Sequence, residues 1–127
     1  LTCKYPANPY YKALHIRNLL IIKDYNQAES IINAAGSNSG NVYLDAQLLV
    51  FKGIIQEKKY RNYIKAKDLY ENGITTIAFA GDFGNEYCGY AYLGLSRICE
   101  YNGDIAGKKA FRKKGLNLID FKKITFD

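Results

Sequence analysis

The sequence predicts an all-α protein, with three antiparallel helical hairpins stacked in one domain that covers residues 1–127. Apolar residues recur at spacings of three and four along most of the chain, which is the pattern of amphipathic helices. Both prolines precede residue 10, so no later segment is barred from being helical. Capping residues and short turns separate the periodic segments, and short turns force consecutive helices to run antiparallel.

The first two predicted helices are joined by one short turn. Asn8 is a good capping residue and Pro9 suits a first turn, so a helix is expected at about residues 10–23. Asp24 caps the next helix, with Gln27 three residues later to complete a capping box, and this helix ends near residue 36. Its predicted apolar stripe consists of Tyr25, Ala28, Ile31, Ile32 and Ala35.

Two longer helices are predicted in the middle of the chain. Asn41 caps the first, which runs to about residue 58, and Asn62 caps the second, which reaches Ala80. The β-branched run at residues 74–77 is assigned to the end of this fourth helix, because no strand alternation surrounds it.

The segment GYAYLGLSRICEYNGD, residues 89–104, combines small residues with leucine and isoleucine in one predicted helix, which Asn85 is expected to cap and which runs to Tyr101. Gly94 and Ser96 predict that a second helix packs very close to it. The pair Gly103–Asp104 ends the helix and begins a sixth one, which runs to about residue 119 and is followed by a tail.

The predicted helix pairs resemble one another. One match has an offset of 45 residues: Ala35-Gly36, Ala46, Leu48 and Val50 correspond to Ala80-Gly81, Ala91, Leu93 and Leu95. A second match has an offset of 38 residues: Tyr25, Ala28, Ile32 and Ala35 correspond to Tyr63, Ala66, Tyr70 and Gly73. Internal similarity of this kind is typical of helical repeat arrays.

This pattern of small and aromatic residues, with a Gly-Asp turn, resembles a degenerate, long-repeat variety of the tetratricopeptide repeat (TPR). The resemblance implies a short right-handed superhelix with repeats at about 9–36, 41–80 and 85–119 and a tail at 120–127. The spacing departs from the standard repeat of about 34 residues. Ile16 replaces the usual small residue of the first repeat, and Lys108 interrupts the last.

The resemblance implies a non-enzymatic scaffold that binds a peptide or partner segment along the concave face of the first helix of each pair. Arg17, Lys52 and Arg97 fall at one equivalent position, so they predict a ladder of cations that grips an acidic segment. The alternative is that they are ordinary polar positions on a solvated face. The predicted peptide-binding residues are Tyr10, Arg17, Asp45, Lys52, Gln56, Tyr90, Arg97 and Tyr101.

The net charge of +6 leaves a second function open. Seven lysines and arginines lie between Lys108 and Lys123, against Asp120 alone, and such a cluster attracts nucleic acid or an anionic surface. The alternative is a solvated outer face of the last helix. A third hypothesis is a regulatory piece of a larger protein.

No residue pattern predicts catalysis, a metal or a cofactor. His15 is the sole histidine, nucleotide-binding and hydrolase motifs are missing, and residues 82–84 (Asp-Phe-Gly) have no kinase companion motifs. Glu57 and Asp68 have lysine neighbours and are expected to be solvated. Cys88 and Cys99 would lie about 16 Å apart on one helix, too far for a disulfide, and are interpreted as small buried hydrophobes.

The sequence leaves the compartment open. No apolar run approaches the roughly 20 residues that span a bilayer. The chain begins with Leu1-Thr2-Cys3, so we expect a processed or excised chain from the cytoplasm, or from the periplasm or envelope if a secretion signal was removed. Lipidation of Cys3 stays open, and the richness in Tyr, Lys, Asn and Ile is typical of an AT-rich bacterial genome.

Overall fold

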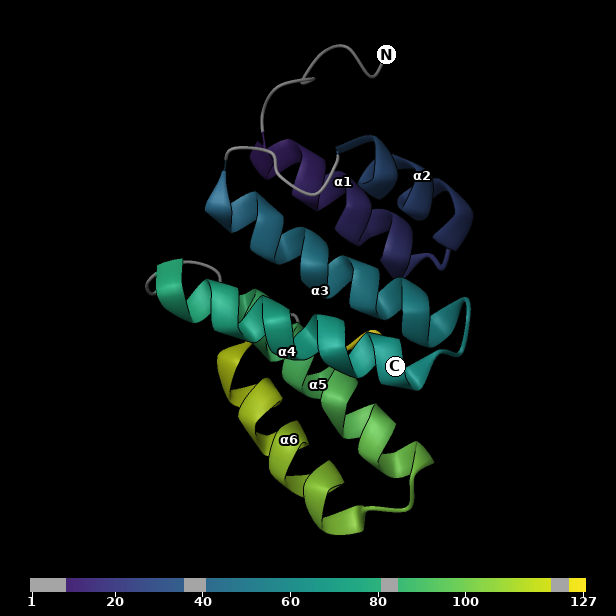
Figure 1. Cartoon of the computed structure of the whole chain (residues 1–127), viewed down its shortest axis with the longest axis vertical. Coiled ribbons are helices and arrows are strands. Elements are labelled where there is room, and N and C mark those ends of the chain that lie inside the picture. The colour runs from purple at the N-terminus through teal and green to yellow at the C-terminus, as the bar shows by residue number, and fades with distance from the viewer. Residues whose placement is uncertain (1–8, 36–40, 81–84, 120–123) are drawn as a thin grey trace.

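The computed structural model describes residues 9–35, 41–80, 85–119 and 124–127, and these contain six α-helices and no strand (Figure 1). The all-α prediction is therefore confirmed for this part of the chain, and each helix lies within about two residues of its expected bounds. The helices are α1 (Pro9–Ile21), α2 (Tyr25–Ala35), α3 (Val42–Lys58), α4 (Tyr63–Ala80), α5 (Asn85–Tyr101) and α6 (Ile105–Leu118).

Four of the predicted caps are confirmed. Each of these side chains accepts a hydrogen bond from a backbone N–H in the first turn of its helix, which satisfies a donor that has no partner within the helix. Asn8 lies outside the described residues, as do Leu1-Thr2-Cys3 and residues 82–84, and Asn85 is itself the first residue of α5. The caps are Asp24 to Gln27 (3.2 Å), Asn41 to Leu44 (3.0 Å), Asn62 to Lys65 (3.2 Å) and Asp104 to Gly107 (2.9 Å).

The turns after α1 and α5 share one hydrogen-bonding motif. In each, a residue with positive φ follows the helix, namely Lys23 (65°) and Gly103 (79°). The next N–H reaches back five residues, from Asp24 to the carbonyl oxygen of Leu19 (2.9 Å) and from Asp104 to that of Cys99 (2.8 Å). These bonds satisfy the last carbonyls of each helix and reverse the chain.

Helix α3 is the central helix of an elongated stack (Figure 1). It packs against α1, α2, α4 and α5, and its most extensive contact is with α4, as that of α5 is with α6. Its buried residues therefore point in nearly every direction, which explains why its apolar face looks unusually wide in the sequence. They are Leu44, Ala46, Leu48, Val50, Phe51, Gly53, Ile54, Ile55 and Glu57.

The ring of Tyr70 on α4 is wedged between glycines of α3 and α5. A Cβ atom added to Gly53 would lie 2.7 Å from a ring carbon, and one added to Gly94 would overlap the ring. Tyr70 itself has no exposed surface. The close approach predicted from Gly94 is confirmed, and an aromatic ring fills the space that the two glycines leave.

Helices α5 and α6 also meet through small residues. A Cβ atom added to Gly89 would lie 3.0 Å from the carbonyl oxygen of Gly115. Ser96, which is 2% exposed, donates a hydrogen bond to the carbonyl oxygen of Lys108 (2.8 Å). Small side chains thus let these two backbones approach closely. Within the described residues, no helix is both long and apolar enough to cross a membrane.

Candidate functional site

A buried ion pair joins α3 to α5. The Glu57 side chain has no exposed surface and that of Arg97 is 7% exposed. Arg97 donates from Nε to Oε2 of Glu57 (2.7 Å) and from Nη2 to Oε1 (3.0 Å), which is bidentate pairing. The hydroxyl of Tyr70 donates to the same Oε1 (2.7 Å), and that of Tyr101 lies 3.4 Å from Oε2.

The prediction that Glu57 is solvated is wrong. Its position continues the apolar face of α3 one turn beyond Gly53 and Ile54, so the helix carries the carboxylate into the interior. Burial of a carboxylate is costly unless it is paired and hydrogen-bonded, and here Arg97 and Tyr70 meet that need. Asp68, the other carboxylate expected to be solvated, is exposed.

The environment fixes the protonation states of the two partners of Glu57. Burial, and then the negative charge of Glu57, raise the pKa of Tyr70 well above its ordinary value, so its hydroxyl remains a donor. Burial lowers the pKa of Arg97, but Tyr70, Glu57 and Asp127 more than offset that effect, and the net shift is upward. Arg97 is therefore a permanent cation held in one orientation.

The fixed guanidinium of Arg97 also holds the segment Ile124–Asp127, which we call segment 124–127. Its Nη1 donates to the carbonyl oxygen of Thr125 (2.6 Å) and lies 3.4 Å from Oδ1 of Asp127. Lys58 on α3 donates to the carbonyl oxygen of Asp127 (3.2 Å), and Arg112 on α6 lies 3.5 Å from its Oδ2. The chain thus returns to the middle of the stack, where the C end is marked in Figure 1.

An aromatic contact anchors the same segment. The ring of Phe126 meets that of Tyr90 edge to face, with centroids 5.0 Å apart and planes at 86°. Tyr90 is fully buried and also meets Tyr87 edge to face at 5.4 Å, and Tyr87 meets Phe51 at 5.5 Å. Phe126 therefore extends a row of rings that begins in the core, and such pairs stabilise beyond the area they bury.

The backbone of Phe126 has a φ of 57°, in a region that bulky residues rarely adopt. This conformation turns the ring toward Tyr90 while the preceding carbonyl faces Arg97. Such backbone strain persists only where the surroundings impose it. The contacts with Tyr90 and Arg97 therefore hold Phe126 in this conformation.

Beside segment 124–127 lies an open pocket of about 430 Å³. Basic side chains outnumber acidic ones along its wall, so it favours negatively charged groups. It is lined by Lys58, Ser96, Arg97, Glu100, Tyr101, Lys108, Arg112 and Asp127.

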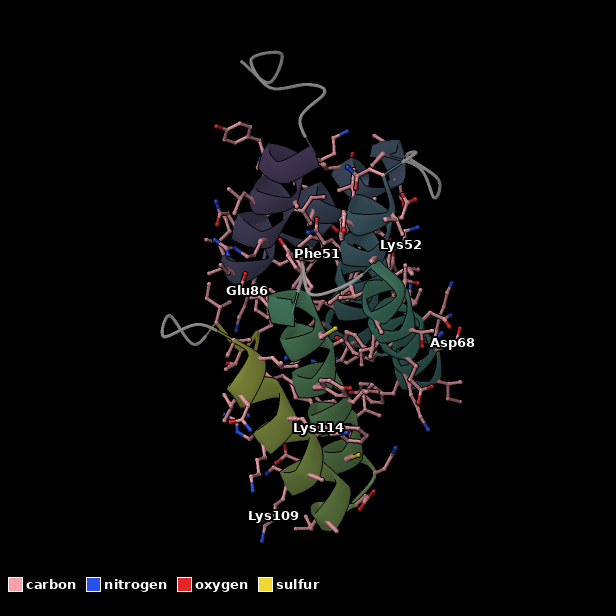
Figure 2. All side chains as sticks on the ribbon, turned by 90° about the vertical axis from the view of Figure 1, so that its left-hand side faces the viewer. Phe51, Lys52, Asp68, Glu86, Lys109 and Lys114 are labelled. Atoms are coloured by element: carbon pink, nitrogen blue, oxygen red, sulfur yellow. The ribbon has the colours of Figure 1, made fainter. Side chains whose placement is uncertain are left out.

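The predicted cation ladder is not assembled on one surface. Arg17 lies 3.7 Å from Glu86 and so links α1 to α5, whereas Arg97 is buried against Glu57. Lys52 lines a different pocket, between α2, α3 and α4. Figure 2 shows Lys52 and Glu86 on opposite sides of the stack, with Phe51 between them. The offset of 45 residues aligns Lys52 with Arg97 in the sequence, but Glu57 is the α3 residue that faces Arg97.

The remaining predicted site residues are divided between these surfaces. Gln56 lines the same pocket as Lys52. Tyr101 stacks on Tyr63 with centroids 4.5 Å apart, and Tyr90 lies under Phe126. Asp45 is partly exposed in the first turn of α3, and the side chain of Tyr10 lies outside the described residues.

Two buried polar atoms, the hydroxyl of Tyr90 and Nε of Arg17, have no hydrogen-bond partner among the residues that the structure describes. Burial raises the pKa of Tyr90, and the charge of Glu86 adds to the rise. Arg17 and Glu86, which lie 3.7 Å apart, both act on the hydroxyl of Tyr90.

Much of the basic cluster on α6 is engaged within the protein. Lys108 pairs with Glu100 (2.8 Å), Lys114 lies over the ring of Tyr92 (5.3 Å to its centroid), and Arg112 reaches Asp127. Lys109 and Lys113 are exposed, and Lys109 points away from the stack in Figure 2. Lys122 and Lys123 lie outside the described residues.

The other reactive side chains are dispersed. Nowhere in the described part of the chain do three or more His, Cys, Asp or Glu residues gather as metal ligands would. His15 is exposed. Cys88 is buried, as expected, but Cys99 is only partly so, and burial raises the pKa of both thiols.

Comparison of the chain with protein-family models, with curated proteins and with solved structures gave no match. The site that the structure does assemble is the one where Lys58, Arg97 and Arg112 meet segment 124–127.

Proposed function

We propose that the protein is a non-enzymatic interaction scaffold of the TPR type, which binds a partner segment in its concave groove. In this proposal the six helices form three antiparallel hairpins, α1–α2, α3–α4 and α5–α6, stacked as a short right-handed superhelix. The groove follows the first helix of each hairpin, and segment 124–127 lies in it.

The packing of the helices supports the stacked arrangement. Among the described residues, helix backbones meet only within a pair or between neighbouring pairs: α1 and α2 touch α3, and α3 and α4 touch α5. No backbone contact joins α2 to α4 or α4 to α6. Nearest-neighbour contacts of this kind are typical of repeat proteins. The turns at Lys23 and Gly103 share one hydrogen-bonding motif, so the first and third helix pairs also resemble each other locally.

The observation that carries the proposed function is that a stretch of peptide already lies against α3, α5 and α6, where the proposal places the groove. Segment 124–127 is bound through a backbone carbonyl, an aromatic ring and a carboxylate, by residues of α3, α5 and α6. These are the kinds of contact by which a scaffold binds an extended segment of another protein.

The charges around the groove indicate an acidic partner. Lys58, Arg97 and Arg112 converge on Asp127, so Arg97 is joined there by Lys58 and Arg112 rather than by Arg17 and Lys52. Salt should weaken such binding, because the side chain of Arg112 is 41% exposed and ions in solution screen its charge.

Fluorescence anisotropy tests this function with a labelled acidic peptide and a matched neutral one, in the native chain and in the Phe126→Ala variant, which loosens the resident segment. We expect the acidic peptide to bind more tightly and to weaken as salt rises. Arg112→Ala should weaken it several-fold, whereas Lys109→Ala, which removes a cation from α6 outside the groove, should not. If both proteins are folded and neither peptide binds to either of them, the proposal is refuted.

A random DNA duplex serves as the competitor in the same assay. If α6 were instead a nucleic-acid surface, the duplex would bind with a steep salt dependence, and Lys109→Ala would weaken it.

A further inference from the structure

We infer that the groove recognises a particular short motif, an aromatic residue followed directly by an acidic one, and that segment 124–127 is an internal copy of this motif which a partner segment displaces. This inference rests on the proposed function, and it specifies the partner and the way in which access to the groove is controlled.

The aromatic position of the motif is defined by Tyr90. Its ring is fully buried, and Tyr87 packs against it edge to face at 5.4 Å. Phe126, which meets the ring of Tyr90 edge to face, is itself only partly buried. A planar ring at this position gains both apolar contact and edge-to-face geometry, which a small aliphatic side chain cannot supply.

The position of the motif backbone is set by Arg97. Its guanidinium is held on Glu57 by two hydrogen bonds of 2.7 and 3.0 Å, so Nη1 points into the groove whether or not a segment is bound. The carbonyl that it meets precedes the aromatic residue. A donor fixed in advance loses little entropy on binding, which favours this one register of the peptide.

The acidic position follows from the same geometry. Oδ1 of Asp127 lies 3.4 Å from Arg97 and Oδ2 lies 3.5 Å from Arg112, so the carboxylate sits between two guanidinium groups. Lys58 takes the next carbonyl oxygen. An uncharged side chain at this place would remove the carboxylate that faces Arg112, while Arg97 would keep its pairing with Glu57.

Segment 124–127 is suited to being displaced. The side chain of Asp127 is 48% exposed, Phe126 is only partly buried, and the backbone of Phe126 holds an unfavourable φ. Because the segment is tethered, it acts at an effective concentration in the millimolar range, so weak contacts are enough to occupy the groove. A partner then binds to the open fraction alone, which weakens its apparent affinity.

The experiment uses three labelled peptides of one sequence that differ at two positions: aromatic-Asp, Ala-Asp and aromatic-Asn. Their affinities are measured by anisotropy for the native chain, for Phe126→Ala and for Asp127→Asn, two variants that weaken the resident segment in different ways. Ile105→Ala is the control, because it removes an exposed apolar side chain of α6 outside the groove. Circular dichroism verifies that each protein is folded.

We expect the aromatic-Asp peptide to bind about tenfold more tightly to Phe126→Ala and to Asp127→Asn than to the native chain or to the control. The Ala-Asp and aromatic-Asn peptides should each bind about tenfold more weakly than aromatic-Asp. In the native chain, NMR should show the amides of Thr125 and Phe126 moving toward unstructured positions as the aromatic-Asp peptide is added.

Three results would overturn the inference while leaving the proposed function standing. These are equal affinity for the native chain and both variants, equal binding of the three peptides, and unchanged Thr125 and Phe126 signals in a saturated complex. If none of the peptides binds to any of the folded proteins, the proposed function fails as well.

Discussion

The ion pair between Glu57 and Arg97 offers the sharpest test of the packing. Arg97→Met keeps an unbranched side chain of similar reach but removes the guanidinium. It thereby removes the hydrogen bonds of 2.7 and 3.0 Å to Glu57 and the bond of 2.6 Å to Thr125. The carboxylate of Glu57, which has no exposed surface, is left with the hydroxyls of Tyr70 and Tyr101 and with a longer contact of 3.8 Å between its Oε2 and Nζ of Lys58.

The expected loss follows from this burial. Removing one partner of a buried pair leaves an uncompensated charge and costs about 3–5 kcal/mol of folding free energy. That is a large part of the roughly 5–15 kcal/mol that stabilises a typical domain. Arg112→Met is the matched control, because Arg112 is 41% exposed and makes only long contacts with Asp127, so its loss should cost less than about 1 kcal/mol.

Urea unfolding followed by circular dichroism measures both variants. The double variant Glu57→Leu, Arg97→Met removes the stranded charge, so it should be more stable than Arg97→Met alone, although the hydroxyl of Tyr70 then lacks its partner at a cost of about 1–3 kcal/mol. If Arg97→Met costs less than about 1 kcal/mol, or if the double variant is no more stable than the single one, the argument from burial is wrong.

Three further predictions follow from the same packing. Gly94→Ala places a methyl group in the ring of Tyr70 and should destabilise by about 1–3 kcal/mol although alanine favours helices; an unchanged melting temperature would contradict the close contact. Ala66→Leu fills a fully buried position on α4 and should cost about 1–3 kcal/mol in the same assay, whereas an unaltered melt would count against a tight seam there. Burial raises the pKa of Asp127, but a hydrogen bond with Thr125 and two nearby guanidinium groups lower it overall. The stabilisation that the ionised Asp127 carboxylate gives to the folded state is therefore complete above its unfolded pKa of about 4. It is lost as the pH falls through the lower pKa of the folded state. NMR shifts of residues 124–127 should show the segment leaving its site as the pH falls through that acidic range. A segment that instead leaves its site as the pH rises above about 5 would contradict the lowered pKa of Asp127.

The helices and their caps could be predicted because their signals are local. Asp24, Asn41, Asn62 and Asp104 each precede an apolar-periodic segment, and the hydrogen bond that each cap accepts comes from three residues away. The close approach at Gly94 could be predicted for a similar reason, since a small residue among large apolar ones indicates a neighbour.

The ion pair could not be predicted because its partners are distant in the sequence. Glu57 stands 13 residues from Tyr70 and 40 from Arg97, and the lysines beside it suggest a solvated surface. A signal was present, because Val50, Gly53 and Ile54 lead to position 57 along one face of α3. Only the structure shows that α5 packs over this face of α3 as far as Glu57, where Arg97 pairs with the carboxylate.

The groove was missed for a different reason. Segment 124–127 has no helical periodicity, and its place depends on contacts with three helices rather than on its own residues. Arg97, which the repeat offset singled out, does contact segment 124–127, but the offset paired it with Lys52, which lines the pocket between α2, α3 and α4. Lys58, which also meets the segment, carried no distinguishing pattern, and Arg112 stood out only as a member of the basic cluster between Lys108 and Lys123.

The most direct measurement is the NMR contact between Phe126 and Tyr90 in the free protein. If the groove holds segment 124–127, nuclear Overhauser effects should connect the two rings, whose centroids lie 5.0 Å apart. They should weaken when an aromatic-acidic peptide is added. Unstructured chemical shifts for residues 124–127, with no such effects in the free chain, would contradict the account.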